Sequence, residues 1–483
     1  MKRSDDLQTL LRPHSVAVVG ASDNPDKVGG RPLKYLITQG FRGQIYAVNP
    51  RSPTVQGLAT HASLEALPEV PDVAILCVGG DQAEAQLEAC VRLGVRNAVL
   101  FASGFAETGD AGRQRQQRLV DICRSGGVRL VGPNCIGISN FSTGAVLSFA
   151  SIYNDFEPKD GPIAIVSQSG GIGVCAYGLL RADGWGVRYV ATSGNESDVD
   201  CADLVEALAR DEGVGIIMLY LENVPDEARM RRALEEAARR RIPVLALRAG
   251  RSADGVRSAA WHTGSGGAVS PSIDKVFEEC GCRTVDNLDE LIATVPLYLG
   301  PNRLAPVGSR ARPSVMLMSN SGAACVMAAD EAARRQVPLA QLGPSTLSQL
   351  ETVLPEFSRN RNPIDLTAAL LSDSSLLGNT VRCVLSDPGV DAATLGLLAI
   401  GGPSYDTPRF ARDTAEAVRA LQKPVAVYSP HVHVRSLFGQ CGLPVFANES
   451  DALNSLDAYW AHRQRLNALP LPIEESKQEI NHD

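Results

Sequence analysis

One histidine lies in a segment that has little to pack against. His262 belongs to the stretch AAWHTGSGGAVSPS, residues 259–272, which holds few side chains that could build a core. Imidazole is neutral and nucleophilic near pH 7, so it can accept a transferred group. A histidine that meets a moving or incoming group would lie in such a loop, and so would one that is merely solvated. Both interpretations of His262 stay open at this point.

A turn rich in serine and glycine could hold an anion. The stretch IAIVSQSGGIGVCAYGLL carries an apolar run, the turn and a helical pattern in that order. Hydroxyl groups and free backbone amides at a helix N-terminus bind oxyanions and phosphate. The candidate phosphate-binding residues are Ser167, Ser169, Gly170 and Gly171. The alternative is an ordinary turn in which Ser169 caps the helix.

A carboxylate ends another apolar run. Glu222 closes the strand-like part of LYLENV, where a buried carboxylate without a partner is costly. Such a carboxylate could bind one nitrogen of an imidazole and fix the tautomer of the ring. Glu222 and His262 are therefore the candidate catalytic residues.

The first strand-like run leads into a turn suited to a nucleotide. SVAVV is followed by GASDNPDKVGG, in which Gly20, Ala21 and Ser22 have no large side chains. Their amides could approach an anion at a helix start. Lys27, next to Val28, adds a cation. The alternative is a plain strand-to-helix turn.

An NAD site is the main competitor for this first turn. It would need G-x-G-x-x-G and an acidic residue about 20 positions further on. The turn lacks the second and third glycines, and the next run, IYAVNPR, supplies Asn49 and Arg51 but no carboxylate for a ribose hydroxyl. Because Arg51 could meet a phosphate, a nucleotide with a ribose phosphate is favoured over NAD. NADP stays open.

The elements that must position these residues follow one pattern. Short β-branched runs, Gly or Ser turns and helical patterns alternate in three series, which start at SVAVV, IAIVS and VMLMS. Near-continuous apolar runs alternating with helices indicate parallel sheets that are covered on both faces. The fold class is therefore α/β, with three parallel-sheet domains and with ligands beyond the carboxyl ends of the strands.

Composition and charge exclude several classes of protein. A net charge of -8 gives no basic surface for nucleic acid. Eleven cysteines scattered through apolar segments fit reduced thiols better than a disulfide framework. The sequence shows no signal segment, membrane span, Walker motif or cluster of metal ligands. We expect a cytoplasmic protein that binds neither membranes nor a metal of its own.

Several motifs follow one another along the chain: GASDNPDKVGG, GFRGQIYAVNP, GFAETG, VGPNCIG, IVSQSGG, SGNESDVDCADL and AAWHTG. In this order they resemble one known family, the NDP-forming acyl-CoA synthetases. Within that family the chain is most similar to the α subunit of ADP-forming acetate–CoA ligases, relatives of the succinyl-CoA synthetase α subunit. The resemblance extends from about residue 10 to NPIDLT at residues 362–367.

The resemblance implies a reaction. The family interconverts acyl-CoA, ADP and phosphate with free acid, CoA and ATP, through an acyl phosphate and a phosphohistidine. His262 matches the phosphorylated histidine, Glu222 the carboxylate that orients it, and Ser167 and Ser169 the phosphate turn. The implied CoA-binding residues are Gly20, Ala21, Ser22, Lys27, Val28, Asn49, Arg51, Asn134 and Cys135.

The resemblance also implies a domain order. A Rossmann-like CoA-binding domain is expected at 8–145 and a succinyl-CoA synthetase-like domain with the phosphohistidine loop at 158–299. A linker at 300–313, a second succinyl-CoA synthetase-like (flavodoxin-like) domain at 314–462 and a tail at 463–483 follow.

No segment resembles an ATP-grasp module. The resemblance therefore implies a separate β subunit that carries the ADP/ATP and Mg²⁺ site, so that the enzyme is a hetero-oligomer.

Trp261 before the histidine and Gly266 after it depart from the family pattern. They motivate one alternative, a non-catalytic subunit that binds CoA or acyl-CoA. A less favoured alternative is an NAD(P)-dependent dehydrogenase. The sequence does not identify the acid.

Overall fold

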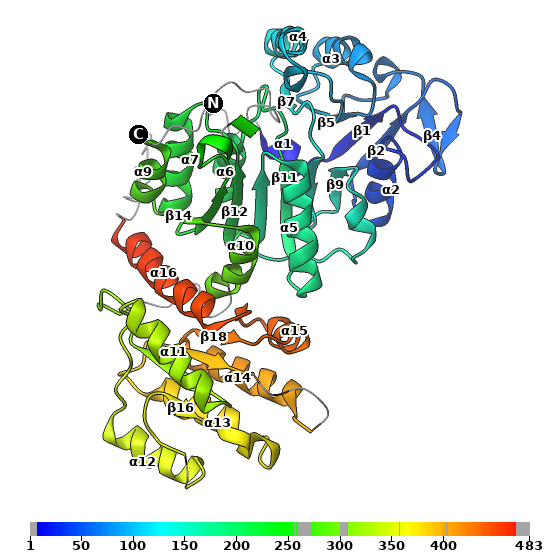
Figure 1. Cartoon of the computed structure of the whole chain (residues 1–483). Coiled ribbons are helices and arrows are strands. Elements are labelled where there is room, and N and C mark those ends of the chain that lie inside the picture. Colours follow the sequence, from blue (N-terminus) through cyan, green and yellow to red (C-terminus); the bar gives the residue numbers. More distant parts are fainter. Residues whose placement is uncertain are drawn as a thin grey trace, which may run out of the picture.

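The computed structural model describes residues 7–469 except 256, 259–271, 300–307, 357, 399 and 401–403. Three α/β units follow one another along the chain, each built on its own sheet (Figure 1). This architecture confirms the predicted fold class. Among the described residues, no helix is both long enough and apolar enough to span a membrane.

The first sheet has the order β3-β4-β2-β1-β5-β6-β7, and its central strand β1 pairs in parallel with β2 and β5. Every residue of β1 is buried, as the apolar run SVAVV predicts. The strands are β1 (Ser15–Val19), β2 (Gln44–Val48), β3 (Thr54–Val55), β4 (Leu58–His61), β5 (Val73–Leu76), β6 (Asn97–Leu100) and β7 (Arg129–Val131). The helices are α1 (Gln8–Leu11), α2 (Arg31–Thr38), α3 (Gly80–Leu93) and α4 (Asp110–Gly126).

The second sheet has the order β14-β13-β12-β10-β11-β8-β9, with β10 between the parallel strands β11 and β12. The strands are β8 (Gly137–Asn140), β9 (Ala145–Ser148), β10 (Ile163–Ser167), β11 (Val187–Thr192), β12 (Ile216–Leu221), β13 (Val244–Arg248) and β14 (Cys282–Val285). The helices are α5 (Gly170–Ala182), α6 (Cys201–Ala209), α7 (Glu227–Arg239), α9 (Ser272–Glu279) and α10 (Leu288–Thr294).

The junction of the first two units differs from the predicted boundary. Residues 137–145 were assigned to the first domain, but β8 pairs antiparallel with β11 and β9 pairs antiparallel with β8, so both extend the second sheet. Sequence patterns identify strands but not their partners, so this exchange between the sheets could not be predicted. The predicted domain boundaries stay predictions.

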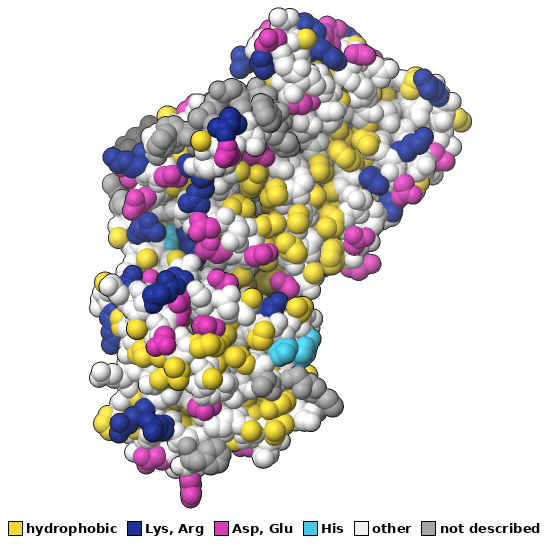
Figure 2. All heavy atoms as spheres, viewed as in Figure 1, with side chains coloured by type: hydrophobic (Ala, Val, Ile, Leu, Met, Phe, Trp, Pro, Cys, Tyr) yellow, Lys and Arg dark blue, Asp and Glu magenta, His cyan; other side chains and the backbone are white. Residues whose placement is uncertain are grey.

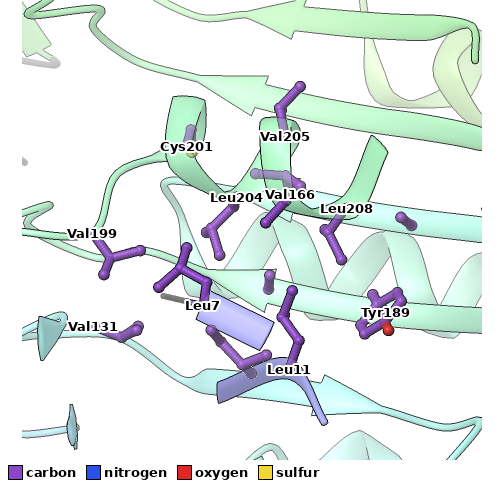
Figure 3. Close-up of a cluster of buried hydrophobic side chains, with 14 of the residues drawn as sticks. Leu7, Leu11, Val131, Val166, Tyr189, Val199, Cys201, Leu204, Val205 and Leu208 are labelled. Carbon is purple, nitrogen blue, oxygen red and sulfur yellow. The ribbon is translucent and has the colours of Figure 1, made fainter. Parts of the chain in front are cut away.

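The start of the chain also crosses this junction. Leu7 and Leu11 lie among side chains of the second unit, including Leu204 and Tyr189 (Figure 3). The side-chain amide of Asn140 donates a hydrogen bond to the carbonyl of Leu11 at 2.9 Å. Burying one leucine contributes roughly 1.5–3 kcal/mol. The two units therefore share a core, which holds the carboxyl ends of their sheets in a fixed relation.

The third sheet is parallel throughout, in the order β16-β15-β17-β18-β19. The strands are β15 (Val315–Ser319), β16 (Ile364–Asp365), β17 (Ala392–Gly396), β18 (Val425–Tyr428) and β19 (Val445–Phe446). The helices are α11 (Gly322–Arg334), α12 (Pro344–Val353), α13 (Leu376–Ser386), α14 (Thr407–Leu421), α15 (Val432–Gln440) and α16 (Glu449–Ala468). Short 3-10 helices occur at Leu64–Ala66, Ala106–Thr108, Ser151–Asn154, Val295–Tyr298 and Thr367–Leu371.

Helix α16 joins the third unit to the second (Figure 1). His462 on this helix is fully buried, and its ring nitrogens lie 2.8 Å from the hydroxyl of Tyr298 and 2.7 Å from the carbonyl of Gly281. A carbonyl only accepts, so Nε2 carries the proton and Nδ1 accepts from the tyrosine. Burial lowers the pKa of His462 to about 3. The ring is therefore a neutral structural contact between two units.

Candidate functional site

A cavity of about 330 Å³ lies where the first two units meet. The first unit and the segment that follows it contribute Phe101, Ser103, Asn134, Cys135, Ile136 and Phe149. The second unit contributes Gln168, Ser169, Gly170, Gly171, Gly194, Asn195 and Glu222. The cavity thus joins two residues predicted to bind CoA, three predicted to bind phosphate and one predicted to be catalytic.

The turn between β10 and α5 forms one wall of this cavity. Ser169 is the N-cap of α5, and its hydroxyl accepts from the amide of Ile172 at 3.4 Å. Gly170 and Gly171 are the first two residues of the helix, and the first amides of a helix have no partner within it. The turn therefore presents amides and the positive end of a helix dipole to the cavity.

Ser167 makes its side-chain hydrogen bond within the turn. Its side chain is fully buried, and its hydroxyl donates to the carbonyl of Ser169 at 2.6 Å. This hydroxyl shapes the turn, and Ser167 is not among the residues that line the cavity. Its predicted contact with phosphate stays a prediction. The spacing Ser-x-Ser alone could not distinguish the two hydroxyls.

Glu222 follows β12, as predicted, and is 7% exposed on the wall of the cavity. The hydroxyl of Tyr220 donates to its Oε1 at 3.2 Å. Burial and the neighbouring charge of Glu222 raise the pKa of Tyr220 well above its usual range. The tyrosine therefore stays protonated and supplies a permanent donor to this carboxylate.

Gln168 was missed by the sequence analysis although it lines the cavity. Its Oε1 accepts from the backbone amides of Glu222 and Asn223, and its Nε2 donates to Oε2 of Glu196 at 2.7 Å. One side-chain amide thus ties the turn after β10 to the end of β12. The only available signal was the position of Gln168 between two serines that had been singled out.

Glu196 contacts Gln168 but is not among the residues that line the cavity. Its Oε1 accepts from the hydroxyl of Ser193 at 2.9 Å and from the amide of Cys201 at 2.8 Å. Burial raises the pKa of Glu196 to about 7, and the charge of Asp200 adds to the rise. The carboxyl group holds Gln168 in one orientation, since only the amide nitrogen of Gln168 can donate to it.

A second chain of polar contacts includes the cavity residues Asn134 and Asn195. Asn134 is exposed, and its Nδ2 donates to Oδ1 of Asn195 at 3.2 Å. Asn195 donates in turn to Glu107 at 2.6 Å. Cys135 is 2% exposed, and burial raises the pKa of its thiol to about 12. The thiol is therefore a wall of the cavity and not a nucleophile.

The backbone amides of the turn after β1 donate to groups of the protein itself. The amides of Gly20 and Ala21 donate to the carbonyl of Val48 at 3.0 and 3.2 Å, and that of Ser22 donates to Gly29 at 3.1 Å. These three amides are engaged within the fold, and α2 begins only at Arg31. The binding of CoA by these three residues stays a prediction, and it would have to use groups other than these amides.

The remaining CoA candidates surround this turn. Asn49 fastens the turn to β2, because its Nδ2 donates to the carbonyl of Ala21 at 2.9 Å. Lys27, Val28 and Arg51 are exposed, and they do not line the cavity. They lie in the loops that follow the central strands β1 and β2, which is where open α/β sheets bind ligands.

His262 and Trp261 lie outside the described residues. The chain leaves β13 after Arg248 and then leads to this segment. Arg248 pairs with Leu221 of β12, and Leu221 directly precedes Glu222. An ion pair of 3.0 Å joins Arg248 to Asp274 at the far end of the segment. Among the described residues, no group of three His, Cys, Asp or Glu side chains could hold a metal ion.

Comparison with known proteins agrees with this geometry. Residues 14–140 match the CoA binding domain family, and residues 160–298 match the succinyl-CoA ligase like flavodoxin domain. The chain is thus of the class that joins these two domains around one cavity.

Known relatives narrow the class further. The chain is 33% identical over 387 residues to subunit α of the ADP-forming acetate–CoA ligase II of Pyrococcus furiosus, covering 80% of this chain and 81% of that one. It is 31% identical over 468 residues to subunit α of ligase I of the same organism, covering 94% and 97%. It therefore belongs to the family of ADP-forming acyl-CoA ligase α subunits.

A solved structure shares the whole arrangement. It is an acetyl-coenzyme A synthetase from Ca. Korarchaeum cryptofilum, in complex with phosphate and ADP. The match has a TM-score of 0.84 and 27% identity, and it covers 96% of this chain and 98% of the other. The resemblance to the NDP-forming acyl-CoA synthetases is confirmed at the level of family and fold.

Proposed function

We propose that this chain is the α subunit of an acid–CoA ligase that interconverts acyl-CoA, phosphate and ADP with acid, CoA and ATP. The observation that carries the proposal is the cavity between the first two units. It combines the N-terminal amides of α5, the carboxylate of Glu222 and the loop of Asn134, all within one small volume. Membership of the ligase family supports the same reaction.

CoA would bind to the first unit. Gly20, Ser22 and Asn49 shape the turn after β1, while Lys27 and Arg51 offer exposed cations to the phosphates of CoA. The thioester would then reach the cavity past Asn134. This assignment of CoA is favoured over NAD(P) by the missing glycines and by the match to the CoA binding domain family.

The first chemical step joins phosphate to the acyl group. A phosphate oxygen attacks the thioester carbonyl, the carbon–sulfur bond breaks, and CoA leaves as a thiolate that takes up a proton. The amides of Gly170 and Gly171 stabilise the negative charge of the phosphate as it enters and reacts. The product is an acyl phosphate at the start of α5.

The second step transfers the phosphoryl group to His262. An imidazole nitrogen attacks phosphorus, the phosphorus–oxygen bond to the acyl group breaks, and the acid leaves as its carboxylate. Glu222 accepts a hydrogen bond from the N–H on the other side of the ring and stabilises its positive charge. Tyr220 holds this carboxylate in place. A chain segment rich in small residues suits a carrier that must reach a second site.

ADP would then receive the phosphoryl group on a separate ATP-grasp β subunit, which is expected to supply Mg²⁺. The relatives are named as α subunits, which supports such a partner. The acid is a small carboxylic acid. All eleven cysteines are free thiols, which fits the cytoplasmic location we propose.

The experiment uses the purified full chain with acetyl phosphate and CoA. We expect acetyl-CoA to form, because the CoA thiol attacks the acyl carbonyl and phosphate leaves. His262→Asn should retain this half-reaction, since the histidine acts in the next step. CoA binding without any acetyl-CoA would instead establish the non-catalytic subunit, and NADP binding without CoA binding would establish the dehydrogenase.

A further inference from the structure

The motif GFAETG contributes one carboxylate that is bound by amide groups. Acidic side chains on the visible face of the molecule lie among basic ones (Figure 2). Oε1 of Glu107 instead accepts from the backbone amides of Gly104 and Phe105 at 2.6 and 3.2 Å. Its Oε2 accepts from Nδ2 of Asn195 at 2.6 Å. Partial burial opposes ionisation, but these hydrogen bonds outweigh it and hold the pKa of Glu107 below its usual range. Glu107 is therefore a carboxylate at neutral pH, which can only accept.

This carboxylate fixes the direction in which the side-chain amide of Asn195 points. Nδ2 of Asn195 donates to Glu107 and also, at 3.0 Å, to Oε1 of Gln116. The same oxygen of Gln116 accepts from the backbone amide of Ala106 at 3.3 Å. Two acceptors thus engage both hydrogens of the Asn195 nitrogen, so its Oδ1 must face the other way.

Asn195 in turn fixes Asn134. Oδ1 of Asn195 can only accept, and it accepts from Nδ2 of Asn134 at 3.2 Å. The backbone of Asn134 is held as well, because its amide donates to the carbonyl of Ala102 at 2.9 Å. Asn134 lines the cavity, and none of the described residues donates to its Oδ1. The polar atom that Asn134 offers to a ligand is therefore an acceptor oxygen.

An acceptor oxygen discriminates between the parts of a CoA molecule. The phosphates of CoA carry negative charge and only accept at neutral pH, whereas the pantetheine arm carries amide N–H groups that donate. We infer that Glu107 is a positioning residue, which acts through Asn195 to hold Asn134 so that its Oδ1 accepts a hydrogen bond from an amide N–H of the pantetheine arm. This inference rests on the proposed function, because it takes CoA as the ligand.

Glu107→Gln reverses the polarity of this chain of contacts with almost no change in size. The introduced side chain can still accept from the amides of its own loop, but its nitrogen then meets the nitrogen of Asn195. Asn195 must turn over, at the cost of its contact with Gln116, and Asn134 must turn with it. The ligand then meets an N–H group where it had met an oxygen. We expect the Kd of acetyl-CoA, measured by calorimetric titration of the full chain, to rise about tenfold.

A second substitution should restore binding. When Glu107→Gln is combined with Asn134→Asp, the turned Asn195 donates to one oxygen of the introduced carboxylate, and the other oxygen accepts from the arm again. The net charge of this double variant equals that of wild type. We expect it to bind acetyl-CoA within about threefold of wild type. If the double variant binds no better than Glu107→Gln, Glu107 has a structural role only and the inference is overturned.

The matched control is Glu84→Gln. Glu84 accepts from Nε of Arg118 at 3.0 Å in the first unit and does not line the cavity, so this variant should bind acetyl-CoA as wild type does. Titration with CoA separates the amide groups of the arm from its thiol. Glu107→Gln should weaken CoA and acetyl-CoA equally, because both carry the arm. Weaker binding of CoA alone would identify the thiol as the donor and overturn the assignment.

Asn134→Gly provides the test if Glu107→Gln does not fold. Asn134 has a φ of +58°, which glycine adopts readily, so this variant removes the acceptor without straining the backbone. We expect the same tenfold rise in Kd, and wild-type affinity in folded Asn134→Gly would overturn the inference. Thermal unfolding shows whether each variant is folded.

The two proposals fail in different ways. If folded wild type binds neither CoA nor acetyl-CoA, the proposed function is wrong and the inference is wrong with it. If wild type binds acetyl-CoA and folded Glu107→Gln binds it equally well, only the role of Glu107 is wrong.

Discussion

Oε1 of Gln168 accepts a hydrogen bond from the backbone amide of Glu222. The same oxygen accepts from Asn223, while the amide nitrogen of Gln168 donates to Glu196. The residue that follows β10 thus fixes the end of β12, and with it the carboxylate proposed to orient His262. This makes Gln168 a positioning residue that acts through the backbone of Glu222.

Replacing Gln168 with leucine should lower the rate of phosphohistidine formation about tenfold while CoA binding is kept. The buried amide of Glu222 and the half-buried amide of Asn223 lose their acceptor, and Glu222 is no longer held. The buried amide alone costs about 1–3 kcal/mol. Labelling rates and calorimetric titration with CoA provide the two measurements. Asn362→Leu is the control, because Asn362 also bridges backbone groups but lies in the third unit. If Gln168→Leu and Asn362→Leu both lose stability but Gln168→Leu is labelled as fast as wild type, Gln168 does not position Glu222.

Tyr220→Phe tests the donor to the catalytic carboxylate. It removes one hydroxyl and keeps the ring, so we expect a drop in labelling rate of about tenfold, which corresponds to about 1.4 kcal/mol. Tyr189→Phe is the matched control, since the hydroxyl of Tyr189 donates to Asp211 at 2.6 Å, away from the cavity. The control should lose stability and retain its labelling rate. Equal rates in wild type and Tyr220→Phe would show that the hydroxyl is not needed.

Gly20→Ala tests the turn proposed to bind CoA. Gly20 has a φ of +80°, and an added Cβ would lie 2.6 Å from the carbonyl of Cys77, so the turn must move. We expect CoA affinity to fall about tenfold or more in calorimetric titration. Gly40→Ala carries the same backbone penalty at φ +85°, but its Cβ would have no neighbour within 4 Å. If both variants bind CoA as wild type does, CoA does not use the turn at Gly20.

The stability of the chain should depend on His462 at acid pH. Its pKa is lowered to about 3 in the folded chain, so between pH 6.5 and 3 the unfolded chain binds one more proton at this site. The stability that depends on neutral His462 is therefore fully present above pH 6.5. Between pH 6.5 and 3 the free energy of unfolding falls by about 1.4 kcal/mol per pH unit. His462→Gln keeps a donor and an acceptor without the titration, so urea unfolding of this variant should show a shallower acid dependence. Parallel pH profiles would contradict the assignment.

Much of the fold could be predicted from local patterns. The apolar runs at β1, β10 and β15 are fully buried strands, each followed by a turn and a helix, as expected. The pairing of strands could not be predicted in the same way, because nothing in the sequence of residues 137–148 indicates that they extend the second sheet. Partners of that kind are fixed by tertiary packing.

The candidate site was predicted in outline only. Residue types identified Glu222 and the turn at Ser169, whose features are local. The contact between Asn195 and Glu107 spans 88 residues and was not foreseen. The bonds made by the amides at Gly20 could not be foreseen, because a loop of ten residues separates this turn from α2. Side-chain direction, not residue type, distinguishes Ser167 from Ser169.

His262 is proposed to carry the phosphoryl group between two sites. The most direct measurement incubates the full chain with acetyl-CoA and [³²P]phosphate and locates the label by mass spectrometry of its peptides. We predict an acid-labile, alkali-stable phosphate on the peptide that contains His262, and no label in His262→Asn. Equal labelling of wild type and His262→Asn, or a phosphate on another residue, would contradict the phosphohistidine mechanism.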